Sequence, residues 1–124
     1  LDCGFGSSFG SDLITAEYID DQGAQVVVPA AIDPETNEKI RAIAIEAYKT
    51  LGCEGMARVD VFLTPENEVV INEINTLPGF TNISMYPKLW QASGISYSAL
   101  ITRLIELALE RHQQSSALKI SMND

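Results

Sequence analysis

Two segments of alternating side chains, joined by a short turn, constrain the fold of this chain more than any other feature. Residues 56–63 alternate apolar and polar side chains, and residues 69–75 do so again, which is the period of a β-strand. Between them the sequence Thr-Pro-Glu-Asn-Glu has the composition of a turn. We therefore predict a β-hairpin whose loop runs from Pro65 to Glu68.

That loop length fixes which side chains of the hairpin share a face. Asp60 is expected opposite Glu73 and Arg58 opposite Asn75, and cross-strand partners lie on the same face. Strict alternation puts Ile71 on that face too. One face of the hairpin is then apolar and can receive a helix, while the other gathers an arginine, two carboxylates and an amide. A slip of one residue would separate this polar patch.

The flanking segments add a strand and three helices. The β-branched run at residues 25–28 predicts a strand that ends before a proline. Asp33 can cap a helix that stops at Gly52, a short helix is expected over roughly residues 84–93, and a longer one begins after Ser96. The last helix carries a wide apolar stripe, made of Leu100, Ile101, Leu104, Ile105, Ala108 and Leu109. Helices packed on an antiparallel sheet define an α+β fold.

The chain divides into three parts, and its composition narrows the classes of partner. Residues 1–16 are rich in glycine and serine and predict a flexible segment, residues 17–112 form one domain, and residues 113–124 are a polar tail. A net charge of -9 repels nucleic acid and anionic membranes. No apolar run approaches the ~20 residues that span a bilayer, and two cysteines do not make a disulfide framework. We expect a cytoplasmic protein with free thiols and neither nucleic acid nor a membrane as a partner.

The polar patch has two interpretations. Asp60, Glu73 and Asn75 supply only oxygen donors, without histidine or cysteine, and such a set suits Mg²⁺ better than zinc. Mg²⁺ commonly takes one or two carboxylates and completes its shell with phosphates and water. The alternative is a solvated polar face, which is common on antiparallel sheets. Patterning alone does not decide between them.

A family resemblance favours the metal site. The strings Ala-Arg-Val-Asp-Val-Phe at residues 57–62 and Asn-Glu-Ile-Asn-Thr-Leu-Pro-Gly-Phe-Thr at 72–81 resemble the magnesium and phosphate site of D-alanine–D-alanine ligases, which are ATP-grasp enzymes. The likeness continues through residues 82–87 and covers roughly residues 18–112. The spacing from Arg through Asp to Glu-x-Asn is widespread among ATP-grasp enzymes, whereas the Asn-Thr-x-Pro-Gly continuation is typical of this family. The resemblance implies the C-terminal part of an ATP-grasp domain.

The resemblance also implies a role for each residue of the metal and phosphate site. Asp60 would bind one Mg²⁺, Glu73 would bridge two, and Asn75 would complete the second, with Mn²⁺ able to replace the magnesium. Arg58 would steady the transferring phosphate and the tetrahedral oxyanion, assisted by the backbone N–H of Gly79.

Two further sets of residues match substrate positions of the family. Ser84 and the N–H of Met85 would hold the carboxylate of the second D-alanine, which suits a helix N-terminus. Phe62, Ile71 and Asn72 match positions that touch the nucleotide, although the first and second of these would fit a core equally well.

The implied reaction makes D-alanyl-D-alanine for peptidoglycan, the cell-wall polymer. ATP phosphorylates the carboxylate of one D-alanine, and the amine of the second attacks the acyl phosphate and expels phosphate. A whole ligase, which in this family can be a homodimer, also has an N-terminal and a central domain. Neither resembles any part of this chain.

The chain departs from the family pattern at one position. Relatives end a phosphate-covering loop in Lys-Tyr, and Glu17-Tyr18 stands there in this sequence. A carboxylate repels a triphosphate, so we expect the chain by itself to be inactive. Two alternatives to the ligase reading stay open: an inactive folded fragment that at most binds Mg-nucleotide weakly, and a D-alanine–D-lactate ligase.

Overall fold

The computed structural model describes residues 2–5 and 30–121, and within them a sheet and three helices. The predicted strand at 25–28, residues 6–16 and the Glu17-Tyr18 pair lie outside the described residues. None of the helices in the described ranges has the length and apolarity that crossing a membrane requires. The elements in chain order are β1 (Asp2–Phe5), α1 (Pro34–Thr50), β2 (Gly55–Leu63), β3 (Val69–Asn75), α2 (Met85–Ala92) and α3 (Tyr97–Ser121).

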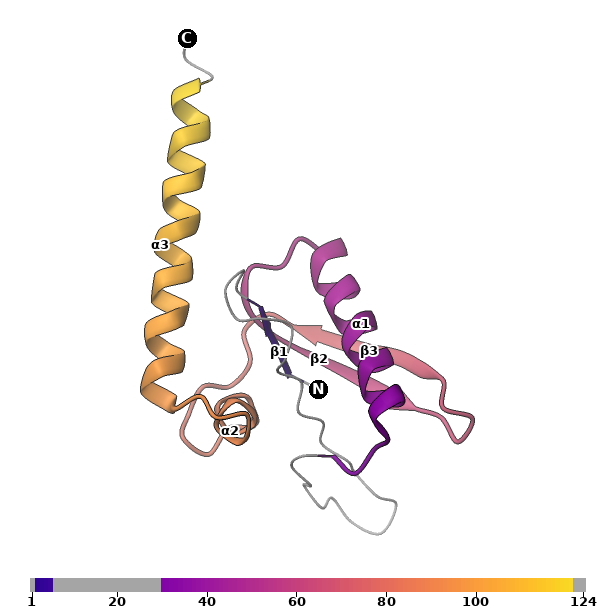
Figure 1. The fold of residues 1–124 in the computed structure, drawn as a ribbon. Helices are drawn as coiled ribbons and strands as arrows, with labels where there is room; N and C mark the ends of the chain where they lie inside the picture. The colour runs from indigo at the N-terminus through magenta and orange to yellow at the C-terminus, as the bar shows by residue number, and fades with distance from the viewer. Residues whose placement is uncertain (1, 6–29, 122–124) are drawn as a thin grey trace.

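The sheet is antiparallel with the order β1-β2-β3, and the hairpin β2–β3 confirms the predicted register at the polar patch (Figure 1). Arg58 pairs with Asn75 and Asp60 pairs with Glu73. The Cα partners on the two strands therefore place the arginine, the carboxylates and the amide on one face.

Nearer the turn the register differs from the prediction by one residue. Val61 pairs with Ile71, so Asn72 is an extra residue on β3, a β-bulge. The loop between the strands holds five residues, 64–68, rather than four. It closes through a hydrogen bond from the Thr64 N–H to the Glu68 carbonyl (2.9 Å).

The bulge corrects one expectation about Ile71. As the partner of Val61, Ile71 lies on the face that carries Val59, opposite to the face of Asp60. Val70 takes its place on the polar face as the partner of Phe62. Strict alternation fails here because one extra residue inverts the side-chain order of the strand.

The described part of the predicted flexible segment also differs from expectation. Residues 2–5 form β1 and pair with β2 from Asp2 opposite Arg58 to Phe5 opposite Gly55. Strand pairing uses backbone groups, so a segment rich in glycine can add to an exposed strand edge without a side-chain signal.

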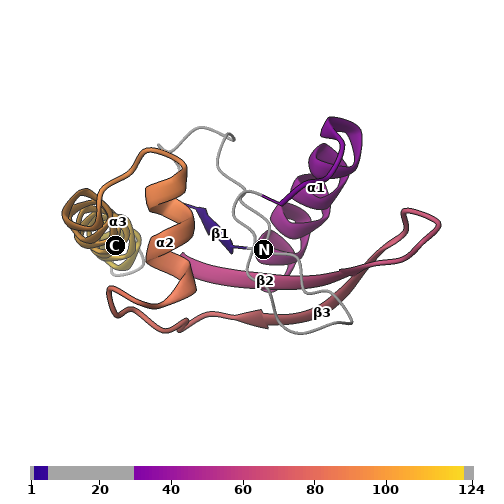
Figure 2. The same cartoon turned by 90° about the horizontal axis from the view of Figure 1, so that it is seen from below.

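Helix α1 covers the apolar face of the sheet, as Figure 2 shows from below. It begins as predicted, with the Asp33 side chain accepting a hydrogen bond from the Thr36 N–H (2.9 Å), and Gly52 follows its end with φ of 64°. Ala44 of α1 and Val59 of β2 are both fully buried and form the centre of this core.

A second core lies between α2 and α3. Tyr86, Trp90 and Leu100 are buried in it, with Phe80 and Ile95 packed against them. Through Phe80 and Tyr86 this cluster holds the segment that connects β3 to α2, which carries several of the predicted site residues.

Helix α3 is longer than the sequence indicated. It continues to Ser121 through the segment predicted to be a polar tail. Residues 113–121 lack an apolar stripe but contain glutamine, alanine, leucine and lysine, which are good helix formers. Figure 1 shows α3 beside α2 at its N-terminal end, with its C-terminal end projecting from the rest of the molecule.

Candidate active site

The polar face of the hairpin is organised around Arg58. Its Nε donates to Asp60 Oδ1 (2.9 Å), and its Nη2 donates both to Asp60 Oδ2 (2.8 Å) and to Glu73 Oε1 (3.2 Å). One guanidinium thus holds two carboxylates from neighbouring strands, a charge-assisted arrangement with the fork geometry that arginine supplies.

Burial and the guanidinium act in opposite directions on Asp60. Partial burial raises the pKa of this carboxyl, whereas its hydrogen bonds to Arg58 and the nearby positive charge lower it. The lowering effects together are larger, so the pKa of Asp60 lies below its ordinary value. Asp60 is therefore ionised at neutral pH. The side chain of Glu73 is more open, with 55% of its surface exposed against 27% for Asp60.

The donor set of this face fits a hard cation. Asp60 and Glu73 accept hydrogen bonds from the same nitrogen atom of Arg58, so both carboxylates are close enough to bind one cation. Asn75 lies opposite Arg58, and its Oδ1 accepts a hydrogen bond from the Leu77 N–H (3.0 Å), which leaves the second lone pair of that oxygen. Within the ranges 2–5 and 30–121, no three His, Cys, Asp or Glu side chains gather into a group, so a cation here would depend on phosphate and water for the rest of its shell.

The loop after β3 brings Gly79 against Ser84. A Cβ on Gly79 would lie 3.1 Å from Ser84 Oγ, which is closer than ordinary contact, so only glycine allows this approach without a shift. The Ser84 hydroxyl accepts from the Thr81 N–H (3.0 Å) and contacts Thr81 Oγ1 (2.8 Å). Two of the predicted site residues therefore lie side by side.

Ser84 is the N-cap of α2, but its side chain makes no capping hydrogen bond to the helix. The hydroxyl turns back to Thr81 instead. The first N–H groups of α2, beginning with Met85, consequently lack the usual side-chain acceptor at the positive end of the helix dipole. This arrangement suits a carboxylate.

Aromatic packing holds the loop in place. Tyr97 Oη donates to the Phe80 carbonyl (2.8 Å), and the Phe80 ring lies 5.5 Å from the Tyr97 ring and 5.8 Å from the Tyr86 ring. Residue 80 is adjacent to Gly79, so the second core and the candidate site are mechanically connected.

An apolar pair lies next to the carboxylates on the same face. Phe62 is 61% exposed, and its cross-strand partner Val70 is 48% exposed. Sequence reasoning selected Phe62 and missed Val70, because alternation predicted the opposite face for it. Val70 lies on the polar face only because of the bulge at Asn72, and no sequence pattern marks that bulge.

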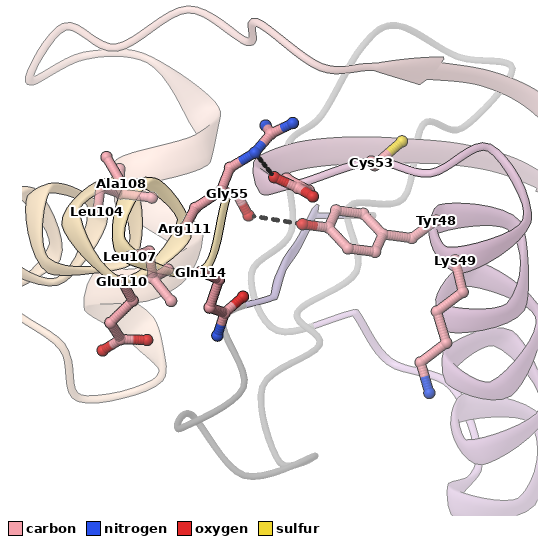
Figure 3. Close-up of a pocket in the computed structure, with 11 residues that line it drawn as sticks. Tyr48, Lys49, Cys53, Gly55, Leu104, Leu107, Ala108, Glu110, Arg111 and Gln114 are labelled. Carbon is pink, nitrogen blue, oxygen red and sulfur yellow. Dashed lines mark hydrogen bonds and ion pairs between the residues drawn. The ribbon is translucent and has the colours of Figure 1, made fainter. Parts of the chain in front are cut away.

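A cavity lies elsewhere in the described part of the chain. It has a volume of about 430 Å³ and lies between the end of α1, residues 53–55 and α3 (Figure 3). Tyr48 lines it and donates to the Gly55 carbonyl (3.0 Å), and burial, with Cys53 and Glu54 nearby, raises the pKa of this tyrosine to about 12. None of the candidate site residues lines this cavity, so the cavity is not part of the candidate site.

Comparison with known proteins assigns the chain to a class and to a family. The fold is the C-terminal part of an ATP-grasp domain: the ligase from Coxiella burnetii matches with a TM-score of 0.71 and 53% identity over 73% of this chain and 27% of that one. The ligase from Bacillus anthracis solved with ATP matches with a TM-score of 0.66 and 33% identity over 70% of this chain and 30% of that one.

Residues 12–106 match the family model of the D-ala D-ala ligase C-terminus, and the chain belongs to this family. D-alanine–D-alanine ligase A of Escherichia coli K12 is 80% identical over 106 residues, which are 86% of this chain and 29% of that relative. The chain therefore spans less than a third of the length of this relative.

Proposed function

We propose that this chain is the metal- and phosphate-holding portion of an ATP-dependent ligase that joins two D-alanines. The observation that carries the proposal is the geometry of Arg58, which holds Asp60 and Glu73 together on one sheet face in a chain of this family. A reaction that consumes ATP would take place in the cytoplasm.

Asp60, Glu73 and Asn75 would hold Mg²⁺ in this proposal. When bound, the metal would neutralise the phosphate oxygens of ATP. Arg58 forms ion pairs with the same carboxylates, and its long side chain would turn from them to the transferring phosphate. Its task is then to stabilise charge that develops on the phosphate and on the tetrahedral oxygen.

The loop and α2 would bind the acceptor. Ser84 Oγ and the Met85 N–H would hold the carboxylate of the second D-alanine, and the Gly79 N–H would donate to the oxyanion. The close approach of Gly79 to Ser84 supports one shared pocket for these groups. Phe62 and Asn72, together with Val70, would contact the nucleotide, whereas the register removes Ile71 from that surface.

We expect the isolated chain to bind Mg²⁺ weakly. Arg58 pairs with Asp60 and Glu73 and competes with the cation for them, and without ATP no phosphate completes the coordination shell of the metal. In an NMR titration, the amides of residues 60 and 73–75 should shift together on the way to saturation. Glu110→Gln, which removes one carboxylate from α3, is the control and should leave the titration unchanged. Shifts confined to α3, or at residue 60 without residue 73, would contradict the assigned metal site.

Activity should require the parts of the ligase relatives that lie outside the segment matched by this chain. We define the chimeric ligase as E. coli ligase A with its matching C-terminal segment exchanged for residues 18–124, so that Glu17 is left out. It should produce D-alanyl-D-alanine from ATP and D-alanine, whereas the isolated chain should release no phosphate above a blank. D-lactate offered as the second substrate tests whether a hydroxyl acceptor is also used.

Two results would overturn this proposal. One is an inactive chimeric ligase that is folded and binds ATP. The other is turnover by the isolated chain that Asp60→Ala abolishes, since the rest of a relative's length would then be dispensable for the reaction.

A further inference from the structure

The peptide unit between Phe80 and Thr81 is held by a side chain at each end. Its carbonyl oxygen accepts a hydrogen bond from Tyr97 Oη (2.8 Å), and its N–H donates to Ser84 Oγ (3.0 Å). A trans peptide unit is planar, with its C=O and N–H directed to opposite sides, so the direction of the carbonyl sets the direction of the N–H. The hydroxyl of Tyr97 in α3 is therefore connected to the hydroxyl of Ser84 through one rigid group.

The position of Tyr97 is fixed by its own helix. Tyr97 is the first residue of α3, and the preceding Ser96 Oγ accepts a hydrogen bond from the Ala99 N–H (3.2 Å), which caps the helix. The rings of Phe80 and Tyr97 lie 5.5 Å apart. This ring contact determines where the loop lies, and the bond from the Tyr97 hydroxyl adds the direction of the Phe80 carbonyl.

The hydrogen bond from Thr81 determines what the Ser84 hydroxyl can do. A serine hydroxyl has one proton and two lone pairs, and the Thr81 N–H takes one of these lone pairs. The proton of Ser84 is then available for donation, either to Thr81 Oγ1 (2.8 Å) or to the carboxylate of a substrate. Consecutive hydrogen bonds polarise one another, so the bond from Tyr97 also makes the Thr81 N–H a stronger donor.

We propose that Tyr97 is a positioning residue for the acceptor substrate. It orients the Ser84 hydroxyl toward the acceptor carboxylate by way of the peptide unit between residues 80 and 81, without touching the substrate itself. The inference rests on the proposed function, because the role of Ser84 is taken from there. Tyr97 is 17 positions from Phe80 along the chain, so no local sequence motif indicates this connection.

The first test is Tyr97→Phe in the chimeric ligase, which removes the hydroxyl and keeps the aromatic ring. KM for D-alanine should rise about 2- to 10-fold, the effect of one hydrogen bond, while kcat and KM for ATP should change little. Tyr48→Phe is the matched control, because it also removes a hydroxyl that donates to a backbone carbonyl, that of Gly55 (3.0 Å). Tyr48 lines the cavity beside α1 (Figure 3), and this control should leave KM for D-alanine unchanged.

A double-mutant cycle with Ser84→Ala tests whether Tyr97 acts through Ser84. In the Ser84→Ala background, Tyr97→Phe should raise KM for D-alanine by much less than it does alone, because the hydroxyl that it orients has been removed. Effects of the two substitutions that multiply in full would mean that they are independent, and the inference would fail.

The isolated chain provides a measurement that does not depend on turnover. In an NMR spectrum the amide proton of Thr81 should shift upfield in Tyr97→Phe, because its peptide unit loses the polarising bond, and it should stay in place in Tyr48→Phe. An inactive chimeric ligase with this shift present would count against the proposed function and support the connection to Ser84.

Two results would overturn the inference while the chimeric ligase is active. One is a Thr81 amide that does not respond to Tyr97→Phe. The other is a Tyr97→Phe variant with a lower Tm and the same KM for D-alanine as Tyr48→Phe, since the hydroxyl would then contribute to stability alone.

Discussion

Arg58→Ala in the chimeric ligase is expected to lower kcat by roughly 100- to 1000-fold, or about 3–4 kcal/mol, because it removes a preorganised donor from charge that develops in the transition state. Arg58→Lys should restore little of this loss, since an ammonium cannot reproduce the two-pronged contact seen with Asp60. Steady-state kinetics at saturating ATP and D-alanine measure both variants.

The ion pairs of Arg58 with Asp60 and Glu73 imply a second, opposite effect of the same substitution. The guanidinium would compete with a cation for Asp60 and Glu73. The Mg²⁺ concentration that gives half-maximal activity should therefore be lower in Arg58→Ala, or unchanged. Ser84→Ala is the comparison variant and should mainly raise KM for D-alanine. If Arg58→Ala changes only KM for ATP, Arg58 binds the ground state and the proposed role is wrong.

Trp90→Ala should be the most destabilising single substitution in the second core. Trp90 is 3% exposed, and its ring lies 6.2 Å from the Tyr86 ring in a T-shaped arrangement. Truncating a buried tryptophan leaves a large cavity and costs about 3–5 kcal/mol, a large share of the total stability of a small domain. Urea unfolding of the isolated chain, followed by circular dichroism, measures the loss.

Two variants separate packing from other effects of this change. Trp90→Phe keeps an aromatic ring and should cost clearly less than Trp90→Ala. Leu51→Ala removes a side chain that is 66% exposed and should change the free energy of unfolding by less than about 0.5 kcal/mol. A cost below about 1 kcal/mol for Trp90→Ala would mean that this core does not carry the loop of Gly79 and Ser84.

Local patterns predicted the elements of the fold well where side chains repeat with a clear period. The alternation of residues 56–63 and 69–75 gave the hairpin, and Asp33 and Gly52 gave the ends of α1, because caps and left-handed stops are decided by neighbouring residues. The pairing of residues 2–5 with β2 could not be predicted, since it depends on which strand edge is exposed in the folded chain.

The sequence predicted the positions of the carboxylates in the candidate site, but not those of the apolar residues beside them. Asp60 and Glu73 were placed opposite each other, as the structure confirms, although the loop length used to place them was one residue short. The two deviations compensate: the loop is longer by one residue, and the bulge at Asn72 restores the pairing. Ile71 and Val70 lie between the loop and the bulge, so their faces were exchanged.

The bulge at Asn72 also divides the hairpin into two parts whose strand register can change independently. The extra residue, Asn72, lies between the Asp60–Glu73 pair and the turn. The strand pairing on the turn side of the bulge can therefore shift by one residue while Asp60 stays opposite Glu73. A single insertion or deletion in residues 64–68 would then exchange which apolar side chains border the carboxylates without moving the carboxylates themselves. Changes of turn length at this tip would thus offer a route to a different apolar surface beside an unchanged pair of carboxylates.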